Sequence, residues 1–253
     1  MSYTLLLTSS IKPSQFSDRI IRNNVDQRLN DYLTTFKKWL LLNDSNITHI
    51  IYADNSGYNL ELVENLAKKY NHFNRIIELI KVKESKVPEG IHYGYSELEI
   101  IDECFKLSKH LNQNEKIIKC SGRLFISNIS VFLKQNEDFD ILIDSRKSSI
   151  IKKQTNYCLS NFFIVKTSFY SENLIGLKSK MIEEKISHFE TLYFKYLYEF
   201  YTNKKFKIKM RYNIEPILHG YGAHWNKNYQ GFKYLLNGKI RNIFRKIAPQ
   251  LWI

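Results

Sequence analysis

The sequence predicts an α/β domain with a mostly parallel sheet that helices flank on both faces. Short apolar runs, which are typical of buried strands, alternate along the chain with longer segments in which apolar residues recur every three or four positions. The chain has 253 residues, of which 43% are hydrophobic and 25% charged, which is enough for one sizeable core. No internal repeat or low-complexity linker divides it, so we expect one domain over residues 1–231 and a C-terminal helix over residues 232–253.

The first half of the chain shows three strand–helix units. Each strand is a short apolar run closed by polar residues, and Asp54-Asn55-Ser56-Gly57 is the strongest turn signal among them. Ser96 and Glu99 have the spacing of a capping box at the start of the third helix. The expected strands are Tyr3–Leu7, Ile47–Ala53 and Arg75–Val82, and the expected helices are Asp18–Leu42, Asn59–Tyr70 and 96–111.

The second half continues the sheet and then becomes mostly helical. Apolar runs predict strands at Lys116–Cys120, Phe139–Ile143 and Phe162–Lys166. Helical spacing covers the segment Leu174–Tyr201, and a basic patch follows at Lys204–Arg211. Strands that alternate with helices in this way favour a mostly parallel sheet.

Polar clusters follow four of the expected strands. They are Thr8-Ser9-Ser10, Asp54-Asn55-Ser56, Ser121-Gly122-Arg123 and Asp144-Ser145-Arg146. In open α/β sheets, ligands bind beyond the carboxyl ends of the strands. Any one cluster is equally consistent with an ordinary polar loop, but four such ends would meet at one edge of the sheet and favour a single cleft.

The charge balance indicates an anionic partner. The formal net charge is +13, which suits nucleic acid, a nucleotide or phosphorylated substrate, or an acidic membrane surface. The glycine motifs of dinucleotide-binding folds and P-loops do not occur, and neither does a zinc-protease motif. The seven histidines show no ligand spacing, and His219 and His224 are expected to be loop residues rather than metal ligands.

Targeting and redox signals are weak. The three cysteines are odd in number and far apart, which favours buried free thiols in a reducing compartment. The apolar run at the N-terminus is too short for a signal peptide, and no apolar stretch approaches the ~20 residues that span a bilayer. We therefore expect a cytoplasmic protein, with peripheral membrane association left open.

The order of these elements resembles that of GT-A glycosyltransferases over residues 3–231. The segment Ile-Ile-Lys-Cys-Ser-Gly-Arg-Leu-Phe-Ile-Ser-Asn (117–128) is similar to the Lys-x-Thr/Ser-Gly-Arg-Tyr segment of bacterial capsule and lipopolysaccharide glycosyltransferases, with Leu124 where that segment carries Tyr. The resemblance implies a GT-A-like (Rossmann-like) fold. It also implies a nucleotide-sugar donor and a glycan or lipid-linked glycan acceptor in the synthesis of a surface polysaccharide.

The resemblance also assigns roles at the strand ends. Asp54 is similar to the acid that reads the nucleotide, and Ser121-Gly122-Arg123 stands where most relatives carry the metal-binding Asp-x-Asp. A guanidinium can meet the negative charge of a leaving phosphate in place of a metal. We therefore expect no metal and no cofactor, although a divalent metal stays open. Asp144 is a lesser candidate for a metal ligand, because it is a single carboxylate and hard divalent cations are bound by several oxygen ligands.

Three further segments complete the expected site. Glu190, in the segment 187–193, resembles the acid at the start of a helix that deprotonates the acceptor hydroxyl; a solvated acid favoured by the helix dipole is the alternative. Glu97 lies beside a loop that lines the donor site in relatives, and the late loop 215–225 resembles one that closes over the substrates. We expect Glu190 and Arg123 to be catalytic. The expected substrate-binding residues are Thr8, Ser9, Ser10, Asp54, Asn55, Ser56, Tyr95, Glu97, Lys119, Ser121, Gly122, Asp144, Arg146, His219 and Tyr221.

The C-terminal segment has the pattern of a basic amphipathic helix. No acid occurs from Asn226 to the end. Such a helix favours binding to a membrane surface, here the inner membrane that carries a lipid-linked acceptor. The alternative is a helix packed on the core. Its expected apolar face consists of Leu236, Ile240, Ile243, Phe244, Ile247 and Leu251, and its cations are Lys239, Arg241, Arg245 and Lys246.

Other function classes remain open from sequence alone. The basic charge and many aromatic residues permit a nucleic-acid-binding protein or nuclease, but no recognised nucleic-acid motif occurs, and we expect no such partner. A nucleotidyltransferase would need a glycine-rich loop and a metal-binding acid pair, which are not found. A nonenzymatic scaffold is the third alternative.

Overall fold

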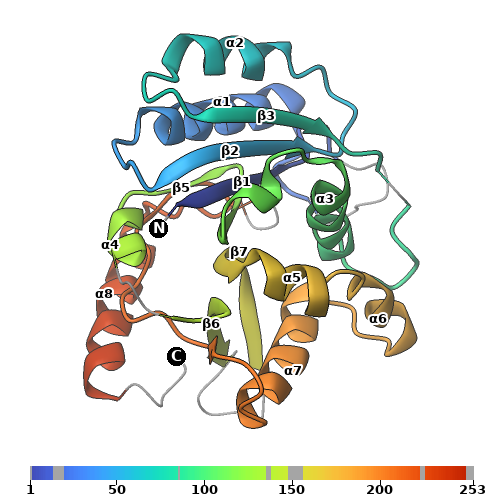
Figure 1. The fold of residues 1–253 in the computed structure, drawn as a ribbon, viewed down its shortest axis with the longest axis vertical. Coiled ribbons are helices and arrows are strands. Elements are labelled where there is room, and N and C mark those ends of the chain that lie inside the picture. Colours follow the sequence, from blue (N-terminus) through green and yellow to red (C-terminus); the bar gives the residue numbers. More distant parts are fainter. Residues whose placement is uncertain are drawn as a thin grey trace.

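A seven-stranded sheet forms the centre of the molecule, in the order β3-β2-β1-β4-β7-β6-β8 (Figure 1). The computed structural model describes residues 2–13, 20–84, 86–134, 138–147, 156–222 and 226–248. The strands are β1 (Tyr3–Ser9), β2 (Ile47–Asp54), β3 (Ile76–Lys81), β4 (Lys116–Ser121), β6 (Ile141–Lys147), β7 (Asn156–Lys166) and β8 (Ile208–Lys209).

The strand directions bring several strand ends to one edge. β1 pairs in parallel with β2 and β4, and β2 pairs in parallel with β3. β7 is antiparallel to both β4 and β6, so β6 runs in the same direction as β4. The carboxyl ends of β1, β2, β4 and β6 therefore lie at the same edge of the sheet.

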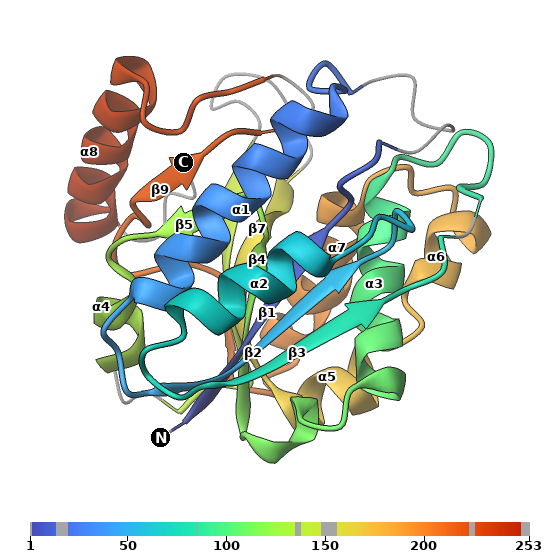
Figure 2. The same ribbon diagram turned by 90° about the horizontal axis from the view of Figure 1, so that it is seen from above.

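Helices cover both faces of the sheet, as the sequence predicted (Figures 1 and 2). Side chains alternate along β1, so Leu5 and Leu7 pack with α1 and α2 while Leu6 packs with α3 and α5 to α7. This two-sided burial explains why β1 is a continuous apolar run. The helices are α1 (Val25–Leu41), α2 (Glu61–Tyr70), α3 (Gly94–Leu107), α4 (Ile129–Lys134), α5 (Thr167–Asn173), α6 (Lys178–Glu183), α7 (Phe189–Thr202) and α8 (Phe232–Ile247), with a short 3-10 helix at Leu111–Gln113.

A two-stranded antiparallel sheet lies beside the carboxyl end of β4. It joins β5 (Leu124–Ile126) to β9 (Leu218–Gly220). Gly220 has a φ of 123°, and a Cβ at this position would lie 2.1 Å from the carbonyl oxygen of Arg123. Only glycine allows this approach. Gly220 is thereby held against Arg123, the second residue after β4.

Several expected boundaries were wrong. The first helix begins at Val25, where the side chain of Asn24 caps it by accepting a hydrogen bond from the amide of Gln27, while the expected start at Asp18 lies outside the described residues. β6 extends to Lys147, so Asp144-Ser145-Arg146 belongs to the strand and not to a loop after it. β7 begins at Asn156, earlier than expected, because it forms a long antiparallel pair with β6. The expected helical segment is divided between α6 and α7.

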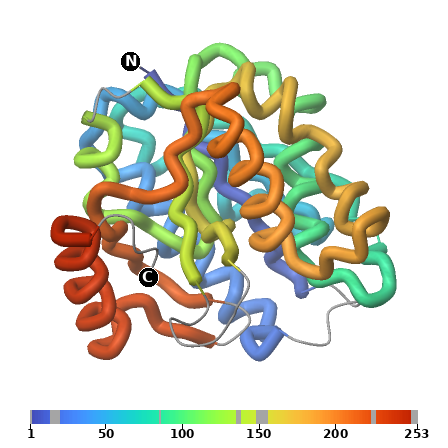
Figure 3. The backbone as a smooth tube through the Cα atoms, turned by 90° about the horizontal axis from the view of Figure 1, so that it is seen from below, coloured from blue at the N-terminus to red at the C-terminus, as the bar shows by residue number. Residues whose placement is uncertain are grey.

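α8 lies at the periphery of the molecule (Figure 3). It begins at Phe232 and ends at Ile247, and Leu251 of the expected apolar face lies outside the described residues. In the parts of the chain that the structure describes, no helix combines the length and the apolar character needed to cross a bilayer.

Candidate active site

A cavity of about 740 Å³ opens at the carboxyl ends of β1 and β4. Its walls come from these strand ends, from α1, α3, β7 and α7, and from the late loop. A smaller hollow of about 580 Å³ lies between α2 and β3 and contains none of the expected site residues. Nine expected residues line the larger cavity, namely Thr8, Ser9, Ser10, Asn55, Glu97, Ser121, Arg123, Glu190 and Tyr221.

Arg123 presents an unsatisfied guanidinium at the cavity wall. Its Nε and Nη1 atoms are buried, and neither has a hydrogen-bond partner among the described residues. The guanidinium carbon lies 5.6 Å from the centre of the Tyr32 ring. A buried cation without an anionic partner is unfavourable. The arrangement therefore suits an anionic ligand that enters the cavity.

Lys119 does not reach the cavity. Its side chain is fully buried, forms an ion pair with Glu97 and donates a hydrogen bond of 2.6 Å to the carbonyl oxygen of Ser160. Glu97 also accepts weaker hydrogen bonds from Thr8 and Ser121. Of the two cations around the end of β4, Arg123 is thus the one that faces a ligand.

Asp54 is turned inward, which corrects the expectation that it lines the site. Its Oδ2 accepts hydrogen bonds from Ser9 Oγ at 2.8 Å and from the amide of Ile11 at 3.0 Å. Its Oδ1 accepts from the amide and the hydroxyl of Ser56 at 2.8 and 2.6 Å. Asp54 therefore organises the loops after β1 and β2. The next residue, Asn55, lines the cavity, and its buried Oδ1 has no partner among the described residues.

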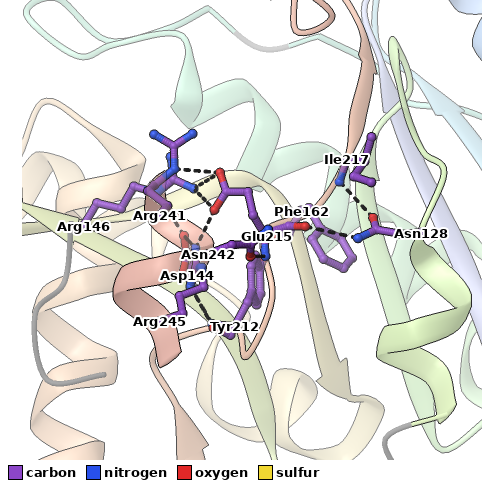
Figure 4. A network of polar contacts seen from close by, with 10 residues as sticks. All are labelled: Asn128, Asp144, Arg146, Phe162, Tyr212, Glu215, Ile217, Arg241, Asn242 and Arg245. Carbon is purple, nitrogen blue, oxygen red and sulfur yellow. Dashed lines mark hydrogen bonds and ion pairs between the residues drawn. The ribbon is translucent and has the colours of Figure 1, made fainter. Parts of the chain in front are cut away.

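Asp144 and Arg146 are likewise absent from the cavity wall, because other charges engage them (Figure 4). Arg245 of α8 pairs with both oxygens of Asp144 at 2.8 Å, and Arg146 bonds Asp144 at 2.9 Å and Glu215 at 3.0 Å. Arg241 and Arg245 also bind Glu215. Burial alone would raise the pKa of Asp144, and the guanidinium groups of Arg146 and Arg245 overcome this and lower it.

Four other expected residues also lie outside the wall. Gly122 has a structural role instead. Its amide donates a hydrogen bond of 2.8 Å to the carbonyl oxygen of Thr8, and a Cβ at this position would lie 3.2 Å from the Tyr32 ring. His219 belongs to β9 and pairs in register with Phe125. The hydroxyl of Ser56 donates a hydrogen bond to Asp54. Tyr95 lies in the first turn of α3, where the centre of its ring is 5.4 Å from the ammonium of Lys178.

Glu190 lies on the cavity wall in the first turn of α7, as expected. Its Oε1 accepts a hydrogen bond of 2.8 Å from Ser160 Oγ on β7. The cavity also contains Tyr93, whose pKa is raised by burial and then by the charges of Glu190 and Glu97. A partly buried carboxylate that faces a ligand cavity can accept a proton from a bound hydroxyl.

Sequence reasoning missed several other lining residues, which lie on helices, next to helix starts and on β7. Arg28 and Tyr32 come from α1, and Arg28 is held by the carbonyl oxygens of Ser10 and Ile11 at 3.1 Å. Ser160, His92 and His188 come from β7 and from the starts of α3 and α7. Glu97 and Glu190 at helix starts were expected from the sequence, but their neighbours His92 and His188 were not.

The metal that the GT-A resemblance implies does not fit the end of β4. Ser121, Gly122 and Arg123 offer no carboxylate there, and a guanidinium cannot be a metal ligand. Within the described ranges, one group of metal-binding side chains is close enough to hold an ion, and it consists of His92, His188 and Glu190. It lines a different part of the cavity wall.

No protein-family model matches the chain, and no curated protein matches its sequence. Its fold is similar to that of an active-site mutant of LgtC, with a TM-score of 0.50 and 12% identity over 77% of this chain and 69% of LgtC. The glycosyltransferase GlyE from Streptococcus pneumoniae TIGR4 gives a TM-score of 0.47 at 9% identity, covering 77% of this chain and 43% of GlyE. The mannosyltransferase Ktr4p from S. cerevisiae, in complex with GDP, gives 0.44 at 9% identity, covering 73% and 61%. The chain thus has the predicted α/β fold, a mostly parallel sheet flanked by helices and of the GT-A type.

Proposed function

We propose that the protein transfers a glycosyl group from a nucleotide-sugar donor to an acceptor hydroxyl bound in the cavity of about 740 Å³. The observation that carries this proposal is the unsatisfied guanidinium of Arg123 at the end of β4. A guanidinium carries a permanent charge and several N–H donors, which match the oxygens of a phosphate. The fold supports this proposal because ligands of such sheets bind at this edge.

Arg123 is proposed to stabilise the leaving group. When the glycosidic bond of the donor breaks, the nucleoside phosphate gains negative charge, and a cation that is already in place lowers the barrier. Because the end of β4 carries no metal-binding carboxylate, we propose that this step needs no metal there. Asn55 and Ser9 lie nearby on the wall and supply polar contacts for the nucleoside.

Glu190 is proposed to accept the proton of the acceptor hydroxyl. Glu190 and Arg123 line the same cavity, and their opposite charges act on the pKa of Tyr93 in opposite directions. Ser160 fixes one oxygen of the carboxylate by a hydrogen bond of 2.8 Å. This positioning directs the carboxylate to one place in the cavity, as a general base requires.

α8 supports a proposed site of action at a membrane surface. Five of its apolar residues are between 44% and 83% exposed. With about 3.6 residues per turn, they form one stripe on the side opposite the buried Gly238 and Arg245. The exposed lysines at positions 233, 239 and 246 share the helix with this stripe. The five apolar residues are Phe232, Leu236, Ile240, Ile243 and Ile247.

We therefore propose that this stripe rests on an anionic bilayer. An apolar face flanked by lysines, with no acid after residue 225, matches a surface of acidic lipids. The acceptor of the proposed transfer would then be a lipid-linked glycan in the synthesis of a bacterial surface polysaccharide. If the protein did not bind a membrane, this apolar stripe would stay exposed to water, which is unusual for a surface of this kind.

Thermal-shift measurements with UDP, GDP, CDP, CMP and TDP test the proposed function, with a single-stranded oligonucleotide as the control ligand. The proposal predicts that one nucleotide raises the melting temperature more than the others do. Binding of the oligonucleotide without any nucleotide would contradict it and favour a nucleic-acid-binding protein.

A further inference from the structure

His92, which is distant in sequence, lies close to His188 and Glu190 at the cavity wall. One ligand atom from each of His92, His188 and Glu190 lies within 4.8 Å of the others. All three side chains line the cavity, and the two imidazole rings are 4.6 Å apart. We propose that these residues form a binding site for a divalent transition-metal ion of the zinc type.

The backbone holds the two histidine segments together. The amide of His92 donates a hydrogen bond of 2.9 Å to the carbonyl oxygen of Ser187, which precedes His188. Gly94 makes the approach possible, because a Cβ there would lie 2.8 Å from the Cβ of Phe189. Phe189 is fully buried in the core. The ligands therefore sit on a fixed frame, as an effective metal site requires.

The carboxylate is also positioned. Oε1 of Glu190 accepts the hydrogen bond from Ser160, which leaves Oε2 as the proposed ligand atom. Hydrogen-bonded ligands of this kind keep their orientation when a metal binds. A carboxylate on a helix, supported from a neighbouring strand, is a stronger ligand than a solvated acid of the same type.

The donor set selects the class of metal. Two imidazoles and one carboxylate are ligands that zinc uses with a further position open to water or substrate. Magnesium and calcium prefer oxygen ligands alone, so this group does not suit them. The three cysteines are all buried and none lines the cavity, so thiolates do not compete for the ion in the folded chain.

Zinc would oppose the proposed reaction rather than support it. This consequence rests on the proposed function, in which Glu190 accepts the proton of the acceptor. A carboxylate that is bound to zinc cannot take that proton, so the ion would inhibit transfer and a chelator would relieve the inhibition. The site would thus couple glycosyl transfer to the availability of free zinc.

Calorimetric titration of the chelator-stripped full chain with zinc chloride tests the site. We expect saturable binding of one ion per chain. The double variant His92→Ala, His188→Ala should bind at least about tenfold more weakly, while His72→Ala, which removes an exposed histidine elsewhere, should bind as the unchanged protein does. Absence of saturable binding, or equal binding by the double variant, would overturn the proposal.

Two further readouts keep the test decisive. Cobalt titration of the unchanged protein should give a visible absorption spectrum that zinc abolishes, and a thiolate charge-transfer band in it would assign the metal to a cysteine and refute the site. Zinc binding without glycosyl transfer would contradict the proposed function but support the site. Transfer that proceeds without any zinc binding would support the function and refute the site.

Discussion

Arg245 lies against Asp144 with each of its two terminal nitrogens 2.8 Å from a different oxygen of the carboxylate. Both side chains are buried, with 1% exposure each, and the pair joins the last helix to strand β6 of the sheet (Figure 4). α8 is therefore attached through its charged side, with Arg241 and Arg245 facing inward. This orientation is what leaves its apolar stripe on the outside.

The Arg245→Ala variant should be markedly less stable than the unchanged protein. Removing the guanidinium leaves Arg146 as the remaining ion-pair partner of Asp144 among the described residues, which costs about 3 kcal/mol of unfolding free energy. Urea denaturation measures this difference. Lys246→Ala, which removes an exposed cation from the next position, should change it by less than about 0.5 kcal/mol. Equal stability of the two variants would contradict the structural role of the pair.

The apolar stripe of α8 should be required for binding to membranes. Replacing Leu236, Ile240 and Ile243 by serine removes exposed apolar area, so co-sedimentation with anionic liposomes should fall at least about tenfold. The fold should tolerate the change because these side chains are not in the core.

A matched control for this experiment replaces Leu41, Leu62 and Ile76 by serine. These residues have similar exposure, between 42% and 50%, but lie on α1, α2 and β3. The control should bind liposomes as the unchanged protein does. Equal binding by both triple variants would refute the proposed membrane face.

Asp54 should contribute to stability, and Asn55 should contribute to nucleotide binding. Asp54→Ala removes an acceptor of four hydrogen bonds in a buried loop and should lower the unfolding free energy by more than about 2 kcal/mol. Asn55→Ala removes a buried oxygen without a partner, so it should weaken nucleotide binding and leave the melting temperature nearly unchanged. Denaturation and nucleotide titration of both variants measure the contrast, and a reversed pattern would show that Asp54 reads the nucleotide.

Asp102 should make the protein more stable in mild acid. Burial raises the pKa of this carboxyl to about 6, against the hydrogen bonds from Gly176 and Tyr170. Because the folded state holds the proton more tightly than the unfolded chain, this group's contribution is fully present below pH ~4 and is lost as the pH rises through about 6, up to ~3 kcal/mol. In the Asp102→Asn variant, the difference between the unfolding free energies at pH 5 and pH 7.5 should be smaller than in the unchanged protein. An unchanged difference would contradict the assignment.

The sheet and the place of the cavity could be predicted because they follow from local patterns. Buried strands such as β1 are continuous apolar runs, and parallel strands put their polar ends at one edge. These two facts located Ser9, Ser121 and Arg123 correctly on the cavity wall.

The inward or outward direction of a single acid could not be predicted in the same way. Asp54 turns inward because donors in its own and a neighbouring loop hold it, and Asp144 because a cation 101 positions later reaches it. The pairing of His92 with His188 is equally non-local, since the two segments meet through the close approach of Gly94 to Phe189 and the hydrogen bond from His92 to Ser187. Contacts between distant segments depend on the packed fold, and spacing in the sequence does not encode them.

Arg123 is proposed to bind the phosphate of a nucleotide without the help of a metal at the end of β4. Calorimetric titration of the chelator-treated protein and of Arg123→Met with UDP, GDP, CDP, CMP and TDP measures this role. We expect one nucleotide to bind the unchanged protein in chelator, and the variant to bind it about 10- to 100-fold more weakly while its unfolding free energy is not reduced. Equal affinity of the variant, or binding that appears only after Mn²⁺ is added, would contradict it.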